Sequence, residues 1–208
     1  MLEPSATCAN CLKPPALCVC DRITKLTAQH QVLILQHPQE QDRDLGTARL
    51  VELSLPKRAK VEVGLSWRSL DHAVGREVDR KQWGVLHLGQ LPRPLTALEQ
   101  TEPIVVLSKA GERMEPSELY GLVVLDGSWS QAKALWWRNP WLLKLPRVML
   151  HPKTPSLYGK MRKEPRPECL STLEAIAEAL VALGEPKESG DTLKRLFRTL
   201  LQRARDAA

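Results

Sequence analysis

The stretch Gly121-Leu122-Val123-Val124-Leu125-Asp126-Gly127-Ser128-Trp129 decides the fold, because it reads as a buried strand that ends at a carboxylate and turns into a helix. Its apolar run contains β-branched residues, which is typical of a strand covered on both faces. Gly127 permits a tight turn, and Ser128 is a favourable N-cap for the segment that follows. Ligands of open α/β sheets bind outside the carboxyl ends of the strands. The stretch therefore predicts a ligand site at Asp126, Ser128 and Trp129.

A second interpretation of this stretch involves no ligand. Asp126 and Ser128 could serve only to cap the helix, while the indole of Trp129 packs in the core. The local pattern is compatible with both interpretations, so the choice between them depends on the rest of the chain.

Strands and helices alternate along the remainder of the sequence. Apolar runs typical of strands occur at 31–35, 103–107 and 146–150. Ser171 and Glu174 carry the signature of a capping box at the start of a later amphipathic helix. This alternation predicts an α/β fold with a mostly parallel sheet flanked by helices.

Length and hydropathy restrict the organisation of the chain. Its 208 residues fit one domain with a small addition, and we divide them into an N-terminal segment, 1–28, and a main domain, 29–208. No apolar run approaches the roughly 20 residues that cross a membrane. The N-terminus lacks the basic and apolar regions of a secretory signal. We therefore expect a cytoplasmic protein without a membrane partner; its protein partners are not indicated.

Four of the five cysteines lie close together near the N-terminus, as Cys8, Cys11, Cys18 and Cys20. In a cytoplasmic protein such a cluster indicates metal binding more than disulfide formation. Four thiolates close a tetrahedral zinc shell and leave no open position, so the zinc would be structural. The alternative is four free thiols.

Basic charge is concentrated in the segment from Lys133 to Arg166. The whole chain carries +6, yet this segment alone has nine basic residues and a single acid, Glu164. Trp136, Trp137 and Trp141 lie among them. Basic residues interleaved with aromatic ones are typical of a surface for a polyanion whose bases can stack. The alternative is an ordinary solvated basic face.

Several motifs together resemble the DTW-domain family of tRNA-uridine aminocarboxypropyltransferases. The family is named for an Asp-x-[Ser/Thr]-Trp motif at a strand end, which stands here at 126–129. The resemblance spans nearly the whole chain. Its other motifs are the cysteine cluster, His37-Pro38-Gln39-Glu40, Thr47-Ala48-Arg49-Leu50, Arg162-Lys163-Glu164-Pro165 and Leu170-Ser171-Thr172-Leu173-Glu174-Ala175.

The resemblance implies a SPOUT-like fold whose C-terminal part forms a trefoil knot, one of the rare exceptions to the rule against knots. The loops of the knot would hold S-adenosylmethionine. One departure from the family is visible: Ser108-Lys109-Ala110-Gly111 stands where relatives tend to have a Pro-Gly-like loop. The implied binding residues are Ser108, Leu125, Asp126, Gly127, Ser128, Trp129, Arg162, Leu170, Ser171 and Thr172.

The implied reaction transfers the 3-amino-3-carboxypropyl group of S-adenosylmethionine to N3 of a tRNA uridine, in the variable loop by the family's pattern. Methylthioadenosine would be released. The tRNA backbone would lie along the basic segment. The implied catalytic residues are Asp126, Ser128, Trp129, Arg49 and Glu40.

The resemblance leaves the individual roles open. Asp126 would either accept the N3 proton or hold the amino group of the donor, and Arg49 or Arg162 would stabilise the uridine anion. Ser128 and Ser171 would bind the carboxylate or ribose of the donor. Two other functions are compatible with the sequence: an S-adenosylmethionine-dependent RNA methyltransferase, and a non-enzymatic, zinc-stabilised RNA-binding module.

Overall fold

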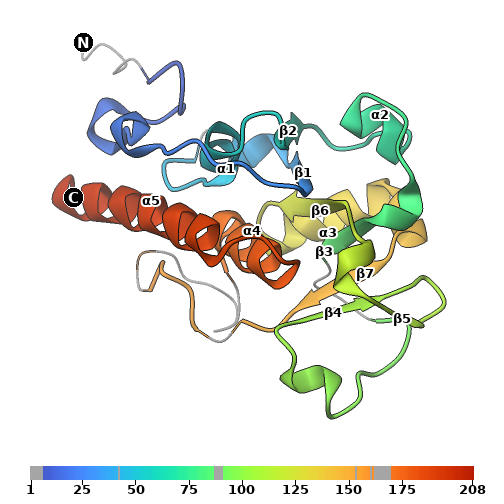
Figure 1. Ribbon diagram of the computed structural model, residues 1–208. Coiled ribbons are helices and arrows are strands. Elements are labelled where there is room, and N and C mark those ends of the chain that lie inside the picture. The colour runs from blue at the N-terminus through green and yellow to red at the C-terminus, as the bar shows by residue number, and fades with distance from the viewer. Residues whose placement is uncertain (1–6, 42, 87–90, 153, 160, 162–169) are drawn as a thin grey trace.

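Residues 121–126 form strand β6, inside a sheet of seven strands (Figure 1). The computed structural model describes residues 7–41, 43–86, 91–152, 154–159, 161 and 170–208. The strand order is β2-β1-β6-β3-β7-β4-β5. The first five run parallel, and β4 and β5 run antiparallel to their neighbours, so the prediction of a mostly parallel sheet is confirmed. The strands are β1 (Gln31–Gln36), β2 (Ala59–Val63), β3 (Trp83–Leu86), β4 (Ile104–Leu107), β5 (Arg113–Met114), β6 (Gly121–Asp126) and β7 (Arg147–Leu150).

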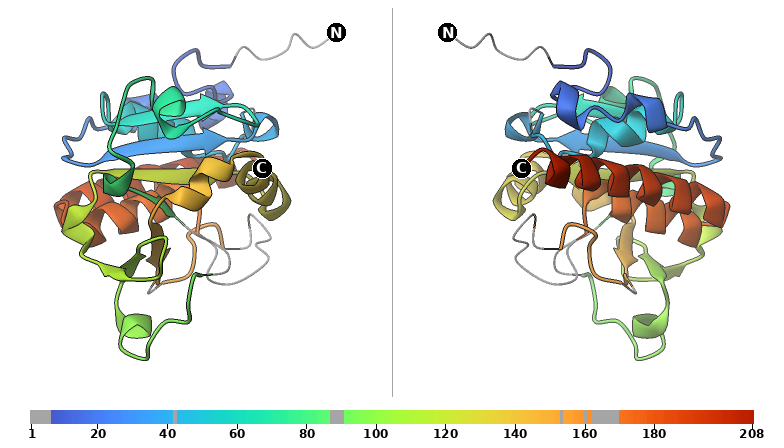
Figure 2. Two further views of the ribbon diagram at one scale, coloured as in Figure 1. Left: turned by 90° about the vertical axis from the view of Figure 1, so that its right-hand side faces the viewer. Right: turned by 90° about the vertical axis from the view of Figure 1, so that its left-hand side faces the viewer.

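Helices cover both faces of this sheet (Figure 2). Alternate residues of β1 point to opposite faces, so Val32 and Ile34 contact one apolar cluster while Leu33 and Leu35 contact another. The first cluster includes side chains of α1, α4 and α5, and the second includes those of α2 and α3. The helices are α1 (Ala48–Ser54), α2 (Leu70–Val74), α3 (Trp129–Arg138), α4 (Thr172–Ala182) and α5 (Lys187–Asp206).

The N-terminal segment lies along α5 (Figure 1). Leu17 and Val19 are buried in the same apolar cluster as the inner face of α5. Arg203 of α5 donates to both carboxylate oxygens of Asp21 at 2.9 Å. The packing therefore joins the cysteine-rich segment to the last helix, and the division of the chain at residue 28 stays a prediction.

The knot predicted for the C-terminal part of the chain would include the connection between β7 and α4. Residues 162–169 of this connection, which include Arg162, lie outside the described residues, so the knot also stays a prediction. In the part of the chain that the structure describes, no helix has the length and apolar character to cross a membrane.

A buried carboxylate fastens the end of α4 to the start of β1. Glu185 accepts hydrogen bonds from the backbone N–H groups of Gln29 and His30 and pairs with Nδ1 of His30 at 2.7 Å. Burial raises the pKa of Glu185, but these donors lower it more, so the net pKa lies below the ordinary value of 4.5. A carboxyl with a depressed pKa stabilises the folded state above its unfolded pKa, and this stabilisation is lost as the pH falls through the folded pKa.

We expect Glu185→Gln to lower the free energy of unfolding at pH 7 by about 2 kcal/mol, because the amide binds these donors less strongly. The difference from the wild type should shrink below about pH 4, where the carboxyl becomes protonated. Urea denaturation of both proteins at pH 7 and again below about pH 4 measures this difference in the free energy of unfolding. Glu178→Gln is the control, because Glu178 forms only a peripheral ion pair with Lys194. An equal loss at both pH values would show that the charge of Glu185 does not contribute.

Candidate functional site

Asp126 lies at the carboxyl end of β6, beside Gln36 at the end of β1. It is 8% exposed. Gln36 Nε2 donates to Asp126 Oδ2 at 2.7 Å, and the hydroxyl of Thr172 donates to Oδ1. Both carboxylate oxygens are therefore oriented by groups from other elements, a neighbouring strand and the first turn of α4.

The turn after Asp126 leaves no room for a side chain at Gly127. A Cβ added there would lie 2.8 Å from Cβ of Gln131 and 3.4 Å from Cβ of His37. Ser128 then caps α3, because its hydroxyl accepts from the N–H of Gln131 while the Gln131 side chain accepts from the N–H of Ser128. Glycine is thus required here for close approach between β6, α3 and the chain after β1.

Trp129 is the first residue of α3 and is 38% exposed. The interpretation that its indole packs in the core is therefore wrong, whereas the capping role of Ser128 is confirmed. Leu125, which precedes Asp126 in β6, is half-buried. Residues 121–129 thus form a strand, a tight turn and the start of a helix, and they place the partly exposed Trp129 three residues after Asp126.

Helix α4 begins at the same edge of the sheet. Ser171 caps it, with Glu174 completing the capping box as predicted. Glu174 is buried and also accepts from the hydroxyl of Ser156 and from the N–H of Leu157. The N–H of Leu173 donates to the hydroxyl of Thr47, which precedes α1. These bonds fix Thr172 against Asp126, and the half-exposed Leu170 lies just before the cap.

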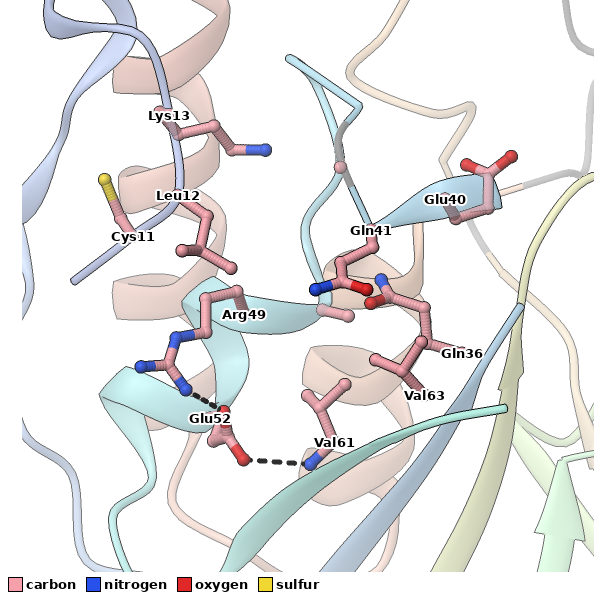
Figure 3. Close-up of a pocket in the computed structure, with 12 residues that line it drawn as sticks. Cys11, Leu12, Lys13, Gln36, Glu40, Gln41, Arg49, Glu52, Val61 and Val63 are labelled. Atoms are coloured by element: carbon pink, nitrogen blue, oxygen red, sulfur yellow. Dashed lines mark hydrogen bonds and ion pairs between the residues drawn. The ribbon is translucent and has the colours of Figure 1, made fainter. Parts of the chain in front are cut away.

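A pocket of about 190 Å³ opens between the N-terminal segment, α1 and the ends of β1 and β2 (Figure 3). Gln36 connects this pocket to Asp126, because it lines the pocket and donates to the carboxylate. Glu40 also lines it and is 6% exposed, with Arg43 as an ion-pair partner at 3.9 Å. The predicted site residue Glu40 therefore lies in the wall of this pocket.

Lys13 is a pocket residue that the sequence analysis missed. It is 3% exposed, extends across the pocket from the N-terminal segment and donates to the carbonyl of Arg43 at 2.7 Å (Figure 3). Burial lowers its pKa to about 8, against the opposing negative charges of Cys11, Asp44 and Asp126. Lys13 thus places a buried cation in this pocket, which Gln36 connects to Asp126.

The four clustered cysteines converge, with all four Sγ atoms within 4.8 Å of one another. Cys8 and Cys20 are 3.6 Å apart and Cys11 and Cys18 are 3.7 Å apart, measured between sulfur atoms. Thiolates around a tetrahedral ion with Zn–S bonds of 2.3 Å lie about 3.8 Å apart. The backbone N–H groups of Cys11 and Asn10 lower the pKa of Cys8 to about 6, whereas burial raises the pKa of Cys20 above its ordinary value. The donor set and its spacing therefore fit a tetrahedral metal ion.

The sequence profile of the DTW domain matches residues 5–205. This chain belongs to the DTW domain family. It is 33% identical to tRNA-uridine aminocarboxypropyltransferase 2 of Drosophila melanogaster, covering 93% of this chain and 72% of the relative. Identity to the mouse protein of that name is 31%, over 95% of this chain and 63% of the relative. Identity to tRNA-uridine aminocarboxypropyltransferase A of Arabidopsis thaliana is 26%, over 94% of this chain and 78% of the relative. No solved structure matches the chain.

Within this DTW domain, the guanidinium of Arg49 binds partners other than Asp126. Its Nε donates to the carbonyl of Asn10 in the cysteine segment at 2.9 Å, and its NH1 group pairs with Glu52. Glu52 in turn accepts from the N–H of Val61 in β2 (Figure 3). Arg49 therefore joins the cysteine segment to α1, in the wall of the pocket.

Ser108 does not lie at the Asp126 edge of the DTW domain, so the expectation that it shares a loop cluster with Asp126 is wrong. Strand β4 is antiparallel to β7 and pairs Leu107 with Arg147, which places Ser108 at the opposite edge of the sheet. Its hydroxyl accepts from the N–H groups of Ala110 and Glu112 inside the tight turn to β5. The strands whose carboxyl ends lie beside that of β6 are β1 and β3, and residues 87–90, which follow β3, are outside the described part.

The predicted RNA segment of the DTW domain is only partly available at the surface. Trp141 is buried and donates to the carbonyl of Trp67, so its expected role in stacking is wrong. Arg147 is buried as well, with burial lowering its pKa, and its guanidinium lies 4.7 Å from the ring centre of Trp136. Lys133, Trp137, Arg138 and Lys144 are exposed, whereas Lys153, Lys160, Arg162, Lys163 and Arg166 lie outside the described residues.

Proposed function

We propose that this DTW domain transfers the 3-amino-3-carboxypropyl group of S-adenosylmethionine to N3 of a uridine in tRNA. Membership of the family, and relatives named tRNA-uridine aminocarboxypropyltransferases, support this activity. The observation that carries it is the buried carboxylate of Asp126, held by Gln36 and Thr172 where α3 and α4 both begin. Ligand sites of α/β sheets lie at such an edge.

The reaction needs alignment and a deprotonated nitrogen. The bond from N3 of uridine to the γ-carbon of the donor forms while the bond from that carbon to the sulfonium breaks, and the sulfur leaves as the neutral thioether of methylthioadenosine. The N3 proton passes to a base. Positioning selects which of the three carbons on the sulfonium reacts, so the protein contributes mainly orientation and charge.

Asp126 is our candidate for the group that accepts the N3 proton or holds the amino group of the donor. The hydroxyls of Ser128 and Ser171 cap their own helices, so we assign the carboxylate of the donor to N–H groups of the first helical turns. Trp129 would stack on the adenine or the uracil. We assign the cation near the reacting nitrogen to Lys13 in place of Arg49, and Glu40 is a further residue of the pocket wall.

Other parts of the proposal rest on the family resemblance. Leu125, Gly127, Arg162 and Leu170 would complete the donor site within a SPOUT-like trefoil knot. Zinc is the metal we assign to the four cysteines, because soft thiolates in tetrahedral spacing suit it. Its role would be structural, holding Lys13 and Asn10 in place. The exposed cations Lys133, Arg138 and Lys144 would contact the tRNA backbone.

Product analysis tests the proposed reaction. The full chain is incubated with S-adenosylmethionine and a tRNA transcript, and nucleosides and small molecules are measured by mass spectrometry. We expect aminocarboxypropyl-uridine and methylthioadenosine in equal amounts. A methylated nucleoside with S-adenosylhomocysteine would instead establish a methyltransferase. Binding of tRNA without any binding of S-adenosylmethionine would establish an RNA-binding module.

A further inference from the structure

The outer face of α3 presents an aromatic and basic stripe that starts at the Asp126 site. Trp129, Lys133 and Trp137 are spaced by four residues, so they follow one another along one side of the helix. The opposite side, with Ala132 and Leu135, is buried against the sheet. Trp137 is 68% exposed, which is unusual for a large aromatic side chain.

The charge of this region indicates what Trp137 contacts. Residues 127–150 contain four basic residues and no acid. Two of these cations, Lys133 and Arg138, are exposed on α3 close to Trp137 in sequence. An exposed indole among cations suits a single-stranded nucleic acid, because bases stack on the ring while phosphates pair with the cations. A protein interface core would instead be depleted of charge.

The geometry sets the distance from the reacting nucleotide. Eight residues of helix separate Trp137 from Trp129, which is about 12 Å at 1.5 Å per residue. One strand of a stacked nucleic acid rises about 3.4 Å per nucleotide. We propose that Trp137 stacks on a base of the tRNA about three to four nucleotides from the modified uridine, with Lys133 contacting a phosphate between them. This inference rests on the proposed function, and it makes Trp137 a determinant of where the tRNA strand lies.

An abasic scan combined with Trp137→Ala tests the inference. In the wild type, one abasic nucleotide within about four positions of the target should raise the KM for tRNA about tenfold, the effect of losing one stacked base. With the intact tRNA, the Trp137→Ala variant should show the same rise in KM as the wild type shows with the abasic tRNA. When this variant is given the abasic tRNA, its KM should not rise further. The turnover number and the affinity for S-adenosylmethionine should stay unchanged, and Trp137→Phe should restore most of the loss.

Two variants serve as controls. Leu98→Ala removes an equally exposed apolar side chain near the short helix at Glu99–Thr101, and it should leave KM unchanged. Lys133→Gln should reduce the slope of log KM against log salt by about 0.7 to 0.9, as for one phosphate contact, whereas Trp137→Ala should leave the slope unchanged.

Two results would overturn the inference. One is that the rise in KM caused by Trp137→Ala adds to the rise caused by each abasic nucleotide, whatever its position. The other is that Trp137→Ala leaves the KM for intact tRNA unchanged. The affinity for tRNA, measured in the absence of S-adenosylmethionine, does not depend on the transfer reaction. It therefore tests the contact of Trp137 with the tRNA even if the proposed reaction does not occur.

Discussion

Replacing Asp126 with asparagine is expected to reduce the rate of group transfer by at least about a hundredfold, the lower range for loss of a positioned acid–base group. Asparagine keeps the size of the side chain and an oxygen that can accept from Thr172. It removes the negative charge and places an NH₂ group opposite Gln36 Nε2, which in the wild type lies 2.7 Å from Asp126 Oδ2. Rotation of the Gln36 amide can restore a hydrogen bond, so the variant should fold with a loss of about 1–3 kcal/mol.

The variant also separates the two roles left open for Asp126. If Asp126 accepts the N3 proton, the single-turnover rate falls while the dissociation constant of S-adenosylmethionine stays near that of the wild type. If Asp126 holds the amino group of the donor, the dissociation constant rises as well. Asp79→Asn is the matched control, because Asp79 caps a short 3-10 helix remote from this edge and should be dispensable for transfer. Unchanged turnover in Asp126→Asn would remove this carboxylate from the mechanism.

The local parts of the site could be predicted from the sequence because local chemistry determines them. An apolar run ending in Asp126-Gly127-Ser128 specifies a strand, a tight turn and a capped helix, and the structure has all three. The capping box of Ser171 and Glu174 is equally local and equally confirmed. The four cysteines lie within thirteen residues, so their convergence required little more than a turn.

The long-range parts could not be predicted in this way. The direction of β4 depends on its pairing with β7, some forty residues later in the chain, and this pairing moves Ser108 to the far edge of the sheet. The burial of Trp141 depends on the carbonyl of Trp67, 74 residues away. Lys13 is buried because its ammonium reaches the carbonyl of Arg43. Ser108 and Trp141 were expected at functional surfaces, and Lys13 was missed, because the distant partner of each residue was not visible in the sequence.

Removing the zinc that we assign to the cysteine cluster is expected to have the second large effect. Without it, four thiols gather with no ion to hold them, and the segment that carries them should detach from α5. Leu17 and Val19 would then lose their burial, which costs about 4 kcal/mol for two such side chains. For a chain of this size that loss lowers the melting temperature by about 10 °C.

Transfer activity should fall together with stability, because the segment supplies two contacts to the pocket. Lys13 would leave the surroundings of Asp126, and Arg49 would lose the carbonyl of Asn10. Chelation by phenanthroline, or Cys11→Ser, should therefore reduce both zinc content and activity, and hydrogen exchange should increase in residues 8–26. The increase should stay confined to this segment and the facing half of α5, because the sheet makes its own core.

Cys169→Ser is the matched control for this experiment, because Cys169 is the one cysteine outside the cluster. It should keep one zinc per chain, the wild-type melting temperature and full activity. Readdition of zinc to the chelated protein should restore activity and protection from exchange together, since both depend on the same segment. If the zinc-free protein kept its melting temperature and its rate of transfer, the apolar packing, hydrogen bonds and Asp21–Arg203 pair of the segment would be sufficient to hold it, and the metal would have no structural role.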